Sequence, residues 1–248
     1  MSRDSHRLLA FDTSTDQLSA AVLHGGQTES RSGPGGAQAS SSLIPFLQSL
    51  LAQAGLDFAG LDAVVFGRGP GSFTGLRTAC ATAQGIAYGA RSAAHPQGLP
   101  VLPVDTLAAV AEETRALSGA TRVLATLDAR MDEVYAQALV WDAESGLWRA
   151  EAGEARLHRP EDLSVPAGWT LGGNAHAAYG DRIAPAAASV FALPTAAALL
   201  RLAPALIAAG GLRGAADALP LYVRDKVAKT TAERAAERAS AAALHGQP

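Results

Sequence analysis

The segment LLAFDTSTDQLSAAVL, residues 8–23, indicates how the fold of this chain begins. Two apolar runs, 8–11 and 18–23, flank the polar stretch 12–16, in which every side chain is a carboxylate or a hydroxyl. This pattern predicts a β-hairpin with a polar turn. A third strand is expected near residues 28–31, before a loop rich in glycine.

Helical and strand patterns alternate after this hairpin. Helices are expected at 43–54, 74–88, 106–117 and 195–209, and strands at 61–66, 101–104, 123–127 and 134–141, with weaker strands near 154–157 and 169–171. Three antiparallel strands that enter a mixed sheet with helices are typical of a ribonuclease-H-like lobe. The order predicts an α/β protein with two such lobes in tandem, the actin-like (ASKHA) architecture.

The domain boundaries follow from this order of elements. We expect an N-terminal lobe over residues 1–105 and a C-terminal lobe over 106–225. The segment 226–248 is rich in Ala, Arg and Glu, and we expect it to be a helical or disordered tail.

Composition excludes several classes of protein. With a net charge of −3, the 248-residue chain lacks the basic excess of a protein that grips nucleic acid by itself. Cys80 is the only cysteine, so an intramolecular disulfide is impossible and a reducing, cytoplasmic location is expected. The polar N-terminus has no signal-peptide pattern, and the apolar stretch 193–212 is interrupted by prolines and Arg201, so we expect no membrane span.

Two segments are candidates for contact with nucleotide phosphates. In the predicted first turn, the carboxylate of Asp12 would suit Mg²⁺, and the hydroxyls of Thr13 and Ser14 would suit phosphate oxygens. The alternative is that these groups simply close the hairpin. The second segment is GRGPGSFTGLR, residues 67–77, which leads into a helix N-terminus.

Within that second segment, Gly69, Gly71 and Ser72 are the predicted phosphate-proximal residues. No Lys follows the glycines, so this is not a P-loop. The alternative is that the glycines permit close packing between strand and helix.

The helices of the first lobe are candidates for a partner interface. Small residues surround the helix expected at 74–88, so two of its faces can be approached closely. One face must cover the sheet, and the other is predicted to meet a second chain, or alternatively the second lobe. The predicted interface residues are Leu43, Leu47, Leu50, Gly75, Thr78, Ala79 and Thr82.

No catalytic or metal-binding motif is visible. The six histidines are scattered, with no pair at i and i+4, and no nucleophile elbow is present. We therefore predict no catalytic residue and no resident metal.

Several segments together resemble the bacterial TsaB (YeaZ) family. They are LLAFDTSTDQLSAAVL, FGRGPGSFTGLRTACATAQGIAYG, PVLPVDTLAAVA, VLATLDARMDEVYAQAL and LPLYVRDKVA, in the usual order and spacing over residues 8–228. The family is an actin-like paralogue of TsaD, the transferase that carries threonylcarbamoyl to N6 of adenosine 37 in tRNA.

This resemblance implies a non-catalytic scaffold subunit that binds and activates TsaD together with the ATPase TsaE. It also implies weak self-association through the same first-lobe helices, and contact with tRNA only through the complex. No cofactor is expected to bind tightly, although ATP or ADP with Mg²⁺ is a candidate at the junction with TsaD.

Two departures concern histidine. TsaD binds its metal through a His pair on the helix that corresponds to residues 37–47, and this chain has none there, which favours TsaB over TsaD. Many TsaB sequences keep one His just before this helix, where Gln38, Ala39 and Ser40 stand here.

Two other functions are the alternatives to this reading of the sequence. An active ATP-dependent kinase or ATPase of the actin-like superfamily would need acidic groups in both lobes, for which the second lobe offers Asp128, and a glycine pair such as Gly172 and Gly173. A metallopeptidase would need metal ligands that the motifs do not supply.

Overall fold

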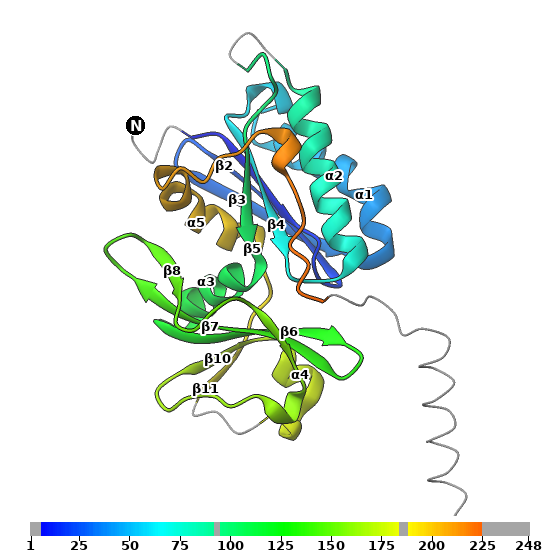
Figure 1. The fold of residues 1–248 in the computed structure, drawn as a ribbon. Coiled ribbons are helices and arrows are strands. Elements are labelled where there is room, and N and C mark those ends of the chain that lie inside the picture. Colours follow the sequence, from blue (N-terminus) through cyan, green and yellow to red (C-terminus); the bar gives the residue numbers. More distant parts are fainter. Residues whose placement is uncertain (1–5, 92–94, 184–187, 225–248) are drawn as a thin grey trace, which may run out of the picture.

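The computed structural model describes residues 6–91, 95–183 and 188–224, which form two lobes, each built around one sheet (Figure 1). The predicted tail at 226–248 lies outside the described residues. The two sheets lie one above the other in this view, with α3 (Thr106–Ser118) and α5 (Ala196–Ala208) between them.

The first sheet has the strand order β3-β2-β1-β4-β5. Its strands are β1 (Leu8–Asp12), β2 (Gln17–His24), β3 (Gln27–Pro34), β4 (Ala63–Gly69) and β5 (Val101–Asp105). β1 and β2 form the predicted hairpin, in which Asp12 pairs with Ser19, and β1 runs parallel to β4.

The second sheet repeats this arrangement in the order β11-β10-β6-β7-β8. Its strands are β6 (Arg122–Arg130), β7 (Glu133–Asp142), β8 (Leu147–Ala150), β9 (Arg156–His158), β10 (Thr170–Gly173) and β11 (Ala188–Phe191), with β9 paired to β7. In both sheets an antiparallel meander of three strands continues into two parallel strands. The predicted α/β fold with two ribonuclease-H-like lobes in tandem is therefore confirmed.

Helices cover both faces of each sheet. α1 (Ala39–Gln53) and α2 (Phe73–Gly89) pack on one face of the first sheet, and α5 packs on its other face. α3 and the short α4 (Ala175–Tyr179) lie on opposite faces of the second sheet. Single turns of 3-10 helix occur at Gly36–Gln38, Phe58–Gly60, Pro160–Asp162, Gly180–Arg182 and Ala215–Asp217.

Several local expectations are corrected. The sequence patterns did not indicate β8, β11 or α4, which are only four or five residues long. β3 extends to Pro34, through part of the expected loop. α1 begins at Ala39, four residues before the expected start at 43, and the hydroxyls of Ser40 and Ser42 in its first turn donate to the carbonyls of Ala37 and Gln38.

The last helix departs from a simple division at residue 105. α5 belongs to the predicted C-terminal lobe by its position in the chain, yet it packs against β1, β2 and β4 of the first sheet. The following segment continues on the first lobe, where Val101 and Arg213 exchange two backbone hydrogen bonds. The chain therefore crosses between the lobes more than once.

No helix in the described ranges is both long enough and apolar enough to span a membrane. α5, which contains much of the apolar stretch at 193–212, has 13 residues and includes Pro204.

Candidate functional site

The turn between β1 and β2 is closed by its own side chains. Asp12 is fully buried, and its Oδ1 accepts hydrogen bonds from the backbone N–H of Ser14 at 2.9 Å and from the Ser14 hydroxyl at 2.6 Å. The buried Thr13 hydroxyl donates to the carbonyl of Gly75 at 2.7 Å. These bonds fix the turn against the N-terminal end of α2.

The glycine loop after β4 lies directly against this turn. A Cβ atom on Gly67 would lie 1.8 Å from Oδ2 of Asp12, and one on Gly71 would lie 2.5 Å from Cβ of Ser14. A Cβ on Gly75 would lie 1.8 Å from the carbonyl oxygen of Thr13. Because any side chain would overlap the first turn, close packing explains these glycines without a ligand.

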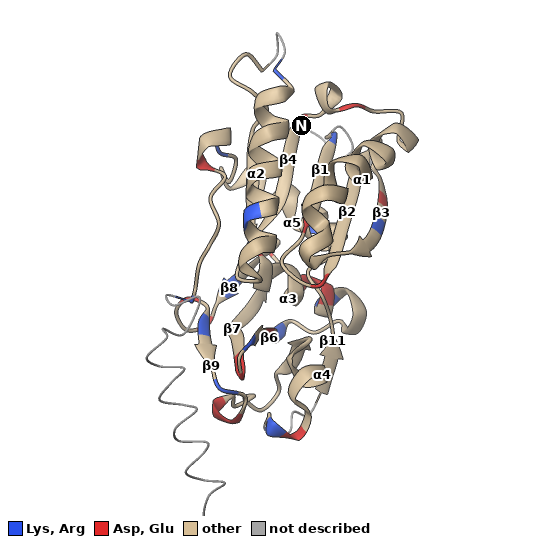
Figure 2. Cartoon of the chain, turned by 90° about the vertical axis from the view of Figure 1, so that its right-hand side faces the viewer, with Lys and Arg blue, Asp and Glu red and all other residues tan. Residues whose placement is uncertain are grey.

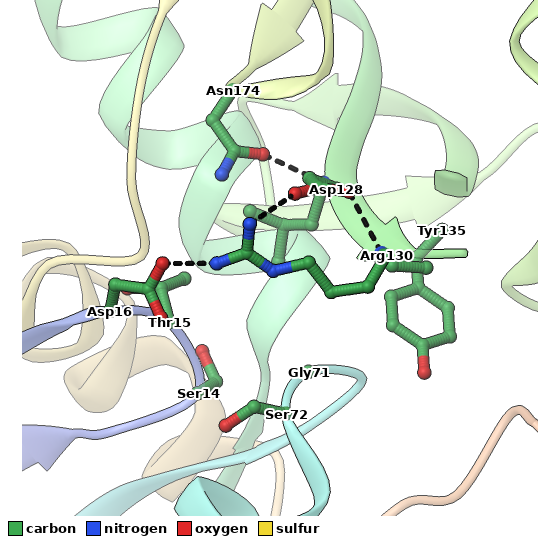
Figure 3. A pocket seen from close by; sticks show the side chains of 11 residues that line it. Ser14, Thr15, Asp16, Gly71, Ser72, Asp128, Arg130, Tyr135 and Asn174 are labelled. Atoms are coloured by element: carbon green, nitrogen blue, oxygen red, sulfur yellow. Dashed lines mark hydrogen bonds and ion pairs between the residues drawn. The ribbon is translucent and has the colours of Figure 1, made fainter. Parts of the chain in front are cut away.

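The turn between β6 and β7 faces the first turn from the second lobe (Figure 3). Arg130 reaches across and forms ion pairs with Asp16 of the first turn and, at 3.3 Å, with Asp128. Asp128 is held in turn by Tyr179, whose hydroxyl donates to Oδ1 at 2.7 Å. Asn174 accepts a hydrogen bond from the backbone N–H of Asp128 at 2.8 Å.

Between the two turns remains a cavity of about 60 Å³. It is lined by Ser14, Thr15, Asp16, Gly71, Ser72, Leu127, Asp128, Ala129, Arg130, Tyr135 and Asn174. Drug-sized ligand pockets measure roughly 300–1,000 Å³, so this space is suited to a few water molecules.

The residues of this cleft do not fit a nucleotide with Mg²⁺. The one guanidinium that could face a phosphate, that of Arg130, is already shared by two carboxylates. The Asp12 carboxylate, the expected Mg²⁺ contact, is 0% exposed and is separated from the cavity by its own turn. A polyphosphate would have to replace the ion pair between Arg130 and Asp16, whose side chains are 67% and 79% exposed.

Only some of the residues that were predicted to lie near a phosphate line this cavity. Ser14, Gly71 and Ser72 line the cavity, whereas Asp12, Thr13 and Gly69 do not. The backbone N–H of Gly69 donates instead to the hydroxyl of Thr106 at 3.0 Å, joining the loop to α3.

Sequence reasoning missed the residues that close the cleft. Asp16, Arg130 and Asn174 were not predicted as site residues, although Arg130 belongs to the DARMDEVY segment, residues 128–135. An arginine at one hairpin turn and carboxylates at the equivalent turn of the other lobe are a sequence signal for an ion pair between the lobes. The pairing partner lies 114 positions earlier in the chain, which no local pattern reveals.

Burial changes the acidity of Asp12. Loss of solvent raises the pKa of this carboxyl to about 6, against the two hydrogen bonds from Ser14, which lower it. Oδ2 has no hydrogen-bond partner in the structure. Asp12 is therefore a structural residue of the turn, whose burial disfavours the ionised carboxylate.

The described residues contain no group of three or more His, Cys, Asp or Glu side chains arranged to hold a metal ion. Cys80 lies in the core between α2 and the first sheet, and burial raises the pKa of its thiol to about 11. The thiol is consequently protonated at neutral pH and is a poor nucleophile.

The predicted interface residues require a correction. Leu43, Leu47, Leu50 and Ala79 are at most 1% exposed and belong to the core beneath α1 and α2. Gly75 is buried against Thr13. The apolar period identified the inner face of the helices, because a helix packed on a sheet buries its most apolar side.

Thr78 and Thr82 remain half-exposed on the outer side of α2, beside the exposed Ala81 and Gly85. A Cβ on Gly85 would meet nothing within 4 Å. Figure 2 looks onto α1 and α2 and shows almost no charge on them: α1 has no charged residue, and α2 has only Arg77. The outer surface of the two helices is therefore uncharged apart from Arg77, with Ile44 and Tyr88 as its exposed large apolar side chains.

Comparison with protein families gives one match that spans most of the chain. The family model described as TsaD, tRNA N6-adenosine threonylcarbamoyltransferase, matches residues 35–240.

Curated relatives and a solved structure agree with this match. The tRNA threonylcarbamoyladenosine biosynthesis protein TsaB of Escherichia coli (strain K12) is 34% identical over 90% of this chain and 96% of its own length. The TsaB protein of Haemophilus influenzae is 32% identical over 89% of this chain and 94% of its own length. The structure of YeaZ from Pseudomonas aeruginosa superposes with a TM-score of 0.78 at 38% identity, and the match covers 88% of this chain and 99% of that one.

Proposed function

Because this chain belongs to the TsaB family, we propose that it is a partner subunit in the biosynthesis of threonylcarbamoyladenosine in tRNA. In this role it binds and activates the TsaD transferase and performs no chemistry of its own.

The closed cleft between the lobes is the observation that supports a non-catalytic role. Arg130 joins Asp16 to Asp128 where an actin-like enzyme would need open space for its substrate. The remaining cavity of about 60 Å³ is too small for a nucleotide or for an adenylate intermediate. With its own cleft filled, the subunit contributes through its surface.

We propose that TsaD docks on the outer face of α1 and α2. This face is uncharged apart from Arg77, and it exposes Ile44 and Tyr88, with Thr82 half-exposed beside them. The absence of side chains at Gly85 and Gly89 allows a partner helix to approach α2 closely.

The other partners follow from the same assignment. A weak homodimer uses the same face and therefore competes with TsaD, whereas TsaE joins the assembled complex. With a net charge of −3, the chain meets tRNA only through its partners. Any ATP or ADP with Mg²⁺ binds at the junction with TsaD rather than in this cleft, and the complex works in the cytoplasm.

Reconstitution tests the role. The purified chain alone, incubated with tRNA, threonine, bicarbonate and ATP, is expected to leave adenosine unmodified, and omission of the chain from the full set of subunits is expected to abolish or strongly reduce modification. Nucleoside analysis of the tRNA measures both results. Modification by the chain alone would refute the proposal.

A substitution tests the docking face. Thr82→Arg places an unpaired charge in the predicted contact and is expected to weaken TsaD binding by at least about tenfold, since burying such a charge costs several kcal/mol. Ala116→Arg, at an exposed position of α3 in the second lobe, is the control. Titration with TsaD measures both affinities, with thermal melting as a check of folding. Equal affinities of the two variants for TsaD would show that the interface lies elsewhere.

The alternative function, an ATP-dependent kinase or ATPase, is disfavoured by the ion pairs of Arg130. An ATPase assay separates the two functions: we expect no turnover above background from the chain alone. Arg130→Ala opens the cleft, and if this variant or the wild-type chain hydrolysed ATP at an enzymatic rate, the alternative would be preferred.

A further inference from the structure

A second cavity, of about 290 Å³, lies where β5, α5, α3 and β8 meet at the junction of the lobes, on the left side of Figure 1. It shares no lining residue with the closed cleft, and α1 and α2 contribute nothing to its wall. Its volume is close to the lower limit of ordinary small-ligand pockets, roughly 300 Å³. The cavity is therefore separate both from the closed cleft and from the face proposed for TsaD.

Most of the wall of this cavity is apolar, and both lobes contribute to it. The apolar side chains come from β5 and α5 on one side and from β8 on the other; they are those of Leu102, Val104, Leu147, Trp148, Leu202 and Leu206. The indole N–H of Trp148 donates to the buried carboxylate of Glu112 at 3.3 Å, so the ring offers the cavity no free donor. A ligand that fills this space must have an apolar body, because polar groups buried there would lose their hydrogen bonds to water.

Charged side chains line the cavity near both ends of β5. Arg213 lies beside Val101 at the start of the strand, and the two residues exchange two backbone hydrogen bonds. Arg68 lies at the other end, where its Nε is 2.5 Å from Oδ1 of Asp105. Val101 and Asp105 are about 13 Å apart along the strand, at about 3.3 Å per residue. The cavity is therefore elongated, with an apolar middle and charged groups at its ends.

One of the two arginines has no carboxylate partner among the described residues. Asp105 pairs with Arg68, whereas Nη1 of Arg213 donates only to the carbonyls of Gly210 at 2.7 Å and Leu212 at 2.8 Å. No hydrogen bond from Nε or Nη2 of Arg213 to another described residue is found. Since the Arg213 side chain is exposed, these two nitrogens are accessible to a ligand. A guanidinium with free N–H groups is well suited to a carboxylate.

Pro103 argues against a peptide strand as the ligand. β5 is an edge strand of the first sheet, and the backbone groups of alternate residues in a strand point to the same edge. The groups of Val101 point outward to Arg213, so those of Pro103 face the same edge, where proline has no N–H to donate. An added peptide strand would lack a hydrogen bond there. A small molecule that needs no backbone hydrogen bonds is the better fit.

We propose that this cavity binds an amphipathic carboxylate, whose apolar chain lies along β5 against Trp148 and α5 and whose carboxylate meets the guanidinium of Arg213. Burial of the chain supplies most of the affinity. The charges fix the orientation, because a carboxylate at the opposite end would face Asp105. This site does not depend on the proposed role beside TsaD, and it is tested without any other subunit.

Calorimetric titration of the full chain with sodium octanoate, below the concentration at which octanoate forms micelles, tests the site. 1-Octanol and octylammonium chloride, which have the same chain length and a neutral or positive head group, are titrated separately. We expect saturable one-to-one binding of octanoate, at least about tenfold tighter than that of 1-octanol, because hydrogen bonds between charged groups are the strong ones. No saturable binding of octylammonium is expected.

A first variant tests the apolar part of the cavity. Ala108→Leu adds volume from α3, where Ala108 is half-buried in the cavity wall. The octanoate affinity is expected to fall by about tenfold or more, and the variant is expected to melt at or above the wild-type temperature, since filling a cavity usually stabilises. Ala116→Leu, at an exposed position of the same helix, is expected to bind octanoate like wild type.

A second variant tests the charged end. Arg213→Gln removes the charge and keeps a polar side chain, so the octanoate affinity is expected to fall to that of 1-octanol, while the 1-octanol affinity stays unchanged. Arg31→Gln is the control, since Arg31 is exposed on β3, at the opposite edge of the first sheet. This control is expected to bind both compounds like wild type.

The proposal is overturned if octanoate shows no saturable binding or if 1-octanol binds as tightly as octanoate. It is also overturned by octanoate binding that Ala108→Leu or Arg213→Gln leaves unchanged, or that the matched control weakens equally. If Ala108→Leu fails to fold, equal octanoate affinities of Arg213→Gln and the wild-type chain are sufficient to overturn it.

Discussion

The β1–β2 turn and the β6–β7 turn occupy equivalent places in the two lobes, yet different parts of the chain hold them. The first turn is closed locally by Asp12 and Ser14 and is covered by the glycine loop, with Thr13 bonded to α2. In the second turn, Arg130, Met131 and Asp132 have φ values of 60°, 57° and 59°. This conformation is sterically strained for residues other than glycine.

The second turn is stabilised from a distance. Arg224, more than 90 positions further along the chain, bonds the carbonyls of Ala129 and Arg130 and the side chain of Glu133. Arg182 holds Asp132 at 2.9 Å. The comparison indicates that the first turn depends on close packing, whereas the second depends on charged side chains that arrive late in the chain.

The largest effect is expected where a side chain is added against the first turn. Gly75→Ala places a methyl group 1.8 Å from the carbonyl oxygen of Thr13, so we expect a loss of about 3 kcal/mol or more in the free energy of unfolding. Gly85→Ala, on the same helix with open space around it, should instead stabilise by about 0.5–1 kcal/mol. Urea denaturation measures both. Similar stabilities of the two variants would contradict the close packing of the first turn.

A pH-dependent effect of comparable size is expected from Asp12. The pKa of Asp12 in the folded protein, about 6, lies above the ordinary value of 3.8. The contribution of the neutral carboxyl to the free energy of unfolding is therefore fully present below about pH 4 and is lost as the pH rises through 6. The loss amounts to about 3 kcal/mol.

Asp12→Asn cannot ionise and should remove this dependence, gaining stability relative to wild type between pH 4 and pH 7. Denaturation at several pH values measures the difference, with Asp181→Asn, at an exposed position, as the control. A constant difference between Asp12→Asn and wild type over this range would show that Asp12 does not titrate there.

A smaller loss is expected when the second turn loses its distant support. Arg224→Ala removes three hydrogen bonds to oxygen atoms of the turn, and we expect a loss of about 2 kcal/mol. Arg213→Ala is the control, since the side chain of Arg213 is exposed and donates only to carbonyls of its own segment. Equal stabilities of Arg224→Ala and Arg213→Ala would mean that the second turn, like the first, does not depend on distant side chains.

The smallest effect is expected from relieving strain at Met131, which is 51% exposed. Met131→Gly should stabilise by about 0.5–1 kcal/mol, because glycine adopts a positive φ without steric cost. Leu117→Gly, at an exposed position in α3, should destabilise by a similar amount. Thermal melting of the two variants measures the signs. A destabilised Met131→Gly variant would show that the side chain matters more than the backbone conformation.

Local patterns predicted most of the architecture because the long elements bury one regular face. The hairpin at residues 8–23 and the helices α1, α2, α3 and α5 were found within a few residues of their observed ends. Short elements such as α4 and β11 contain too few residues to show a period. The predicted domain boundaries remain predictions, although the return of α5 to the first sheet shows that the chain order alone does not separate the lobes.

The candidate site was predicted only in part. Ser14, Gly71 and Ser72 line the cavity between the lobes, and that they lie near a phosphate stays a prediction. The predicted interface leucines were wrong as contact residues, since Leu43, Leu47 and Leu50 face the chain's own core. An apolar period shows which side of a helix is most hydrophobic, but not what covers it.

The fold class, the lack of a recognisable catalytic motif and the family resemblance can be read from the amino-acid sequence, because they depend on periodicity and on motifs of adjacent residues. The packing of the two lobes was needed to show that Arg130 pairs with both Asp16 and Asp128 and that Asp12 is buried. Each of these facts joins residues or surfaces from distant parts of the chain. Their energies depend on burial and on distance between atoms, and both exist only once the two lobes have packed together.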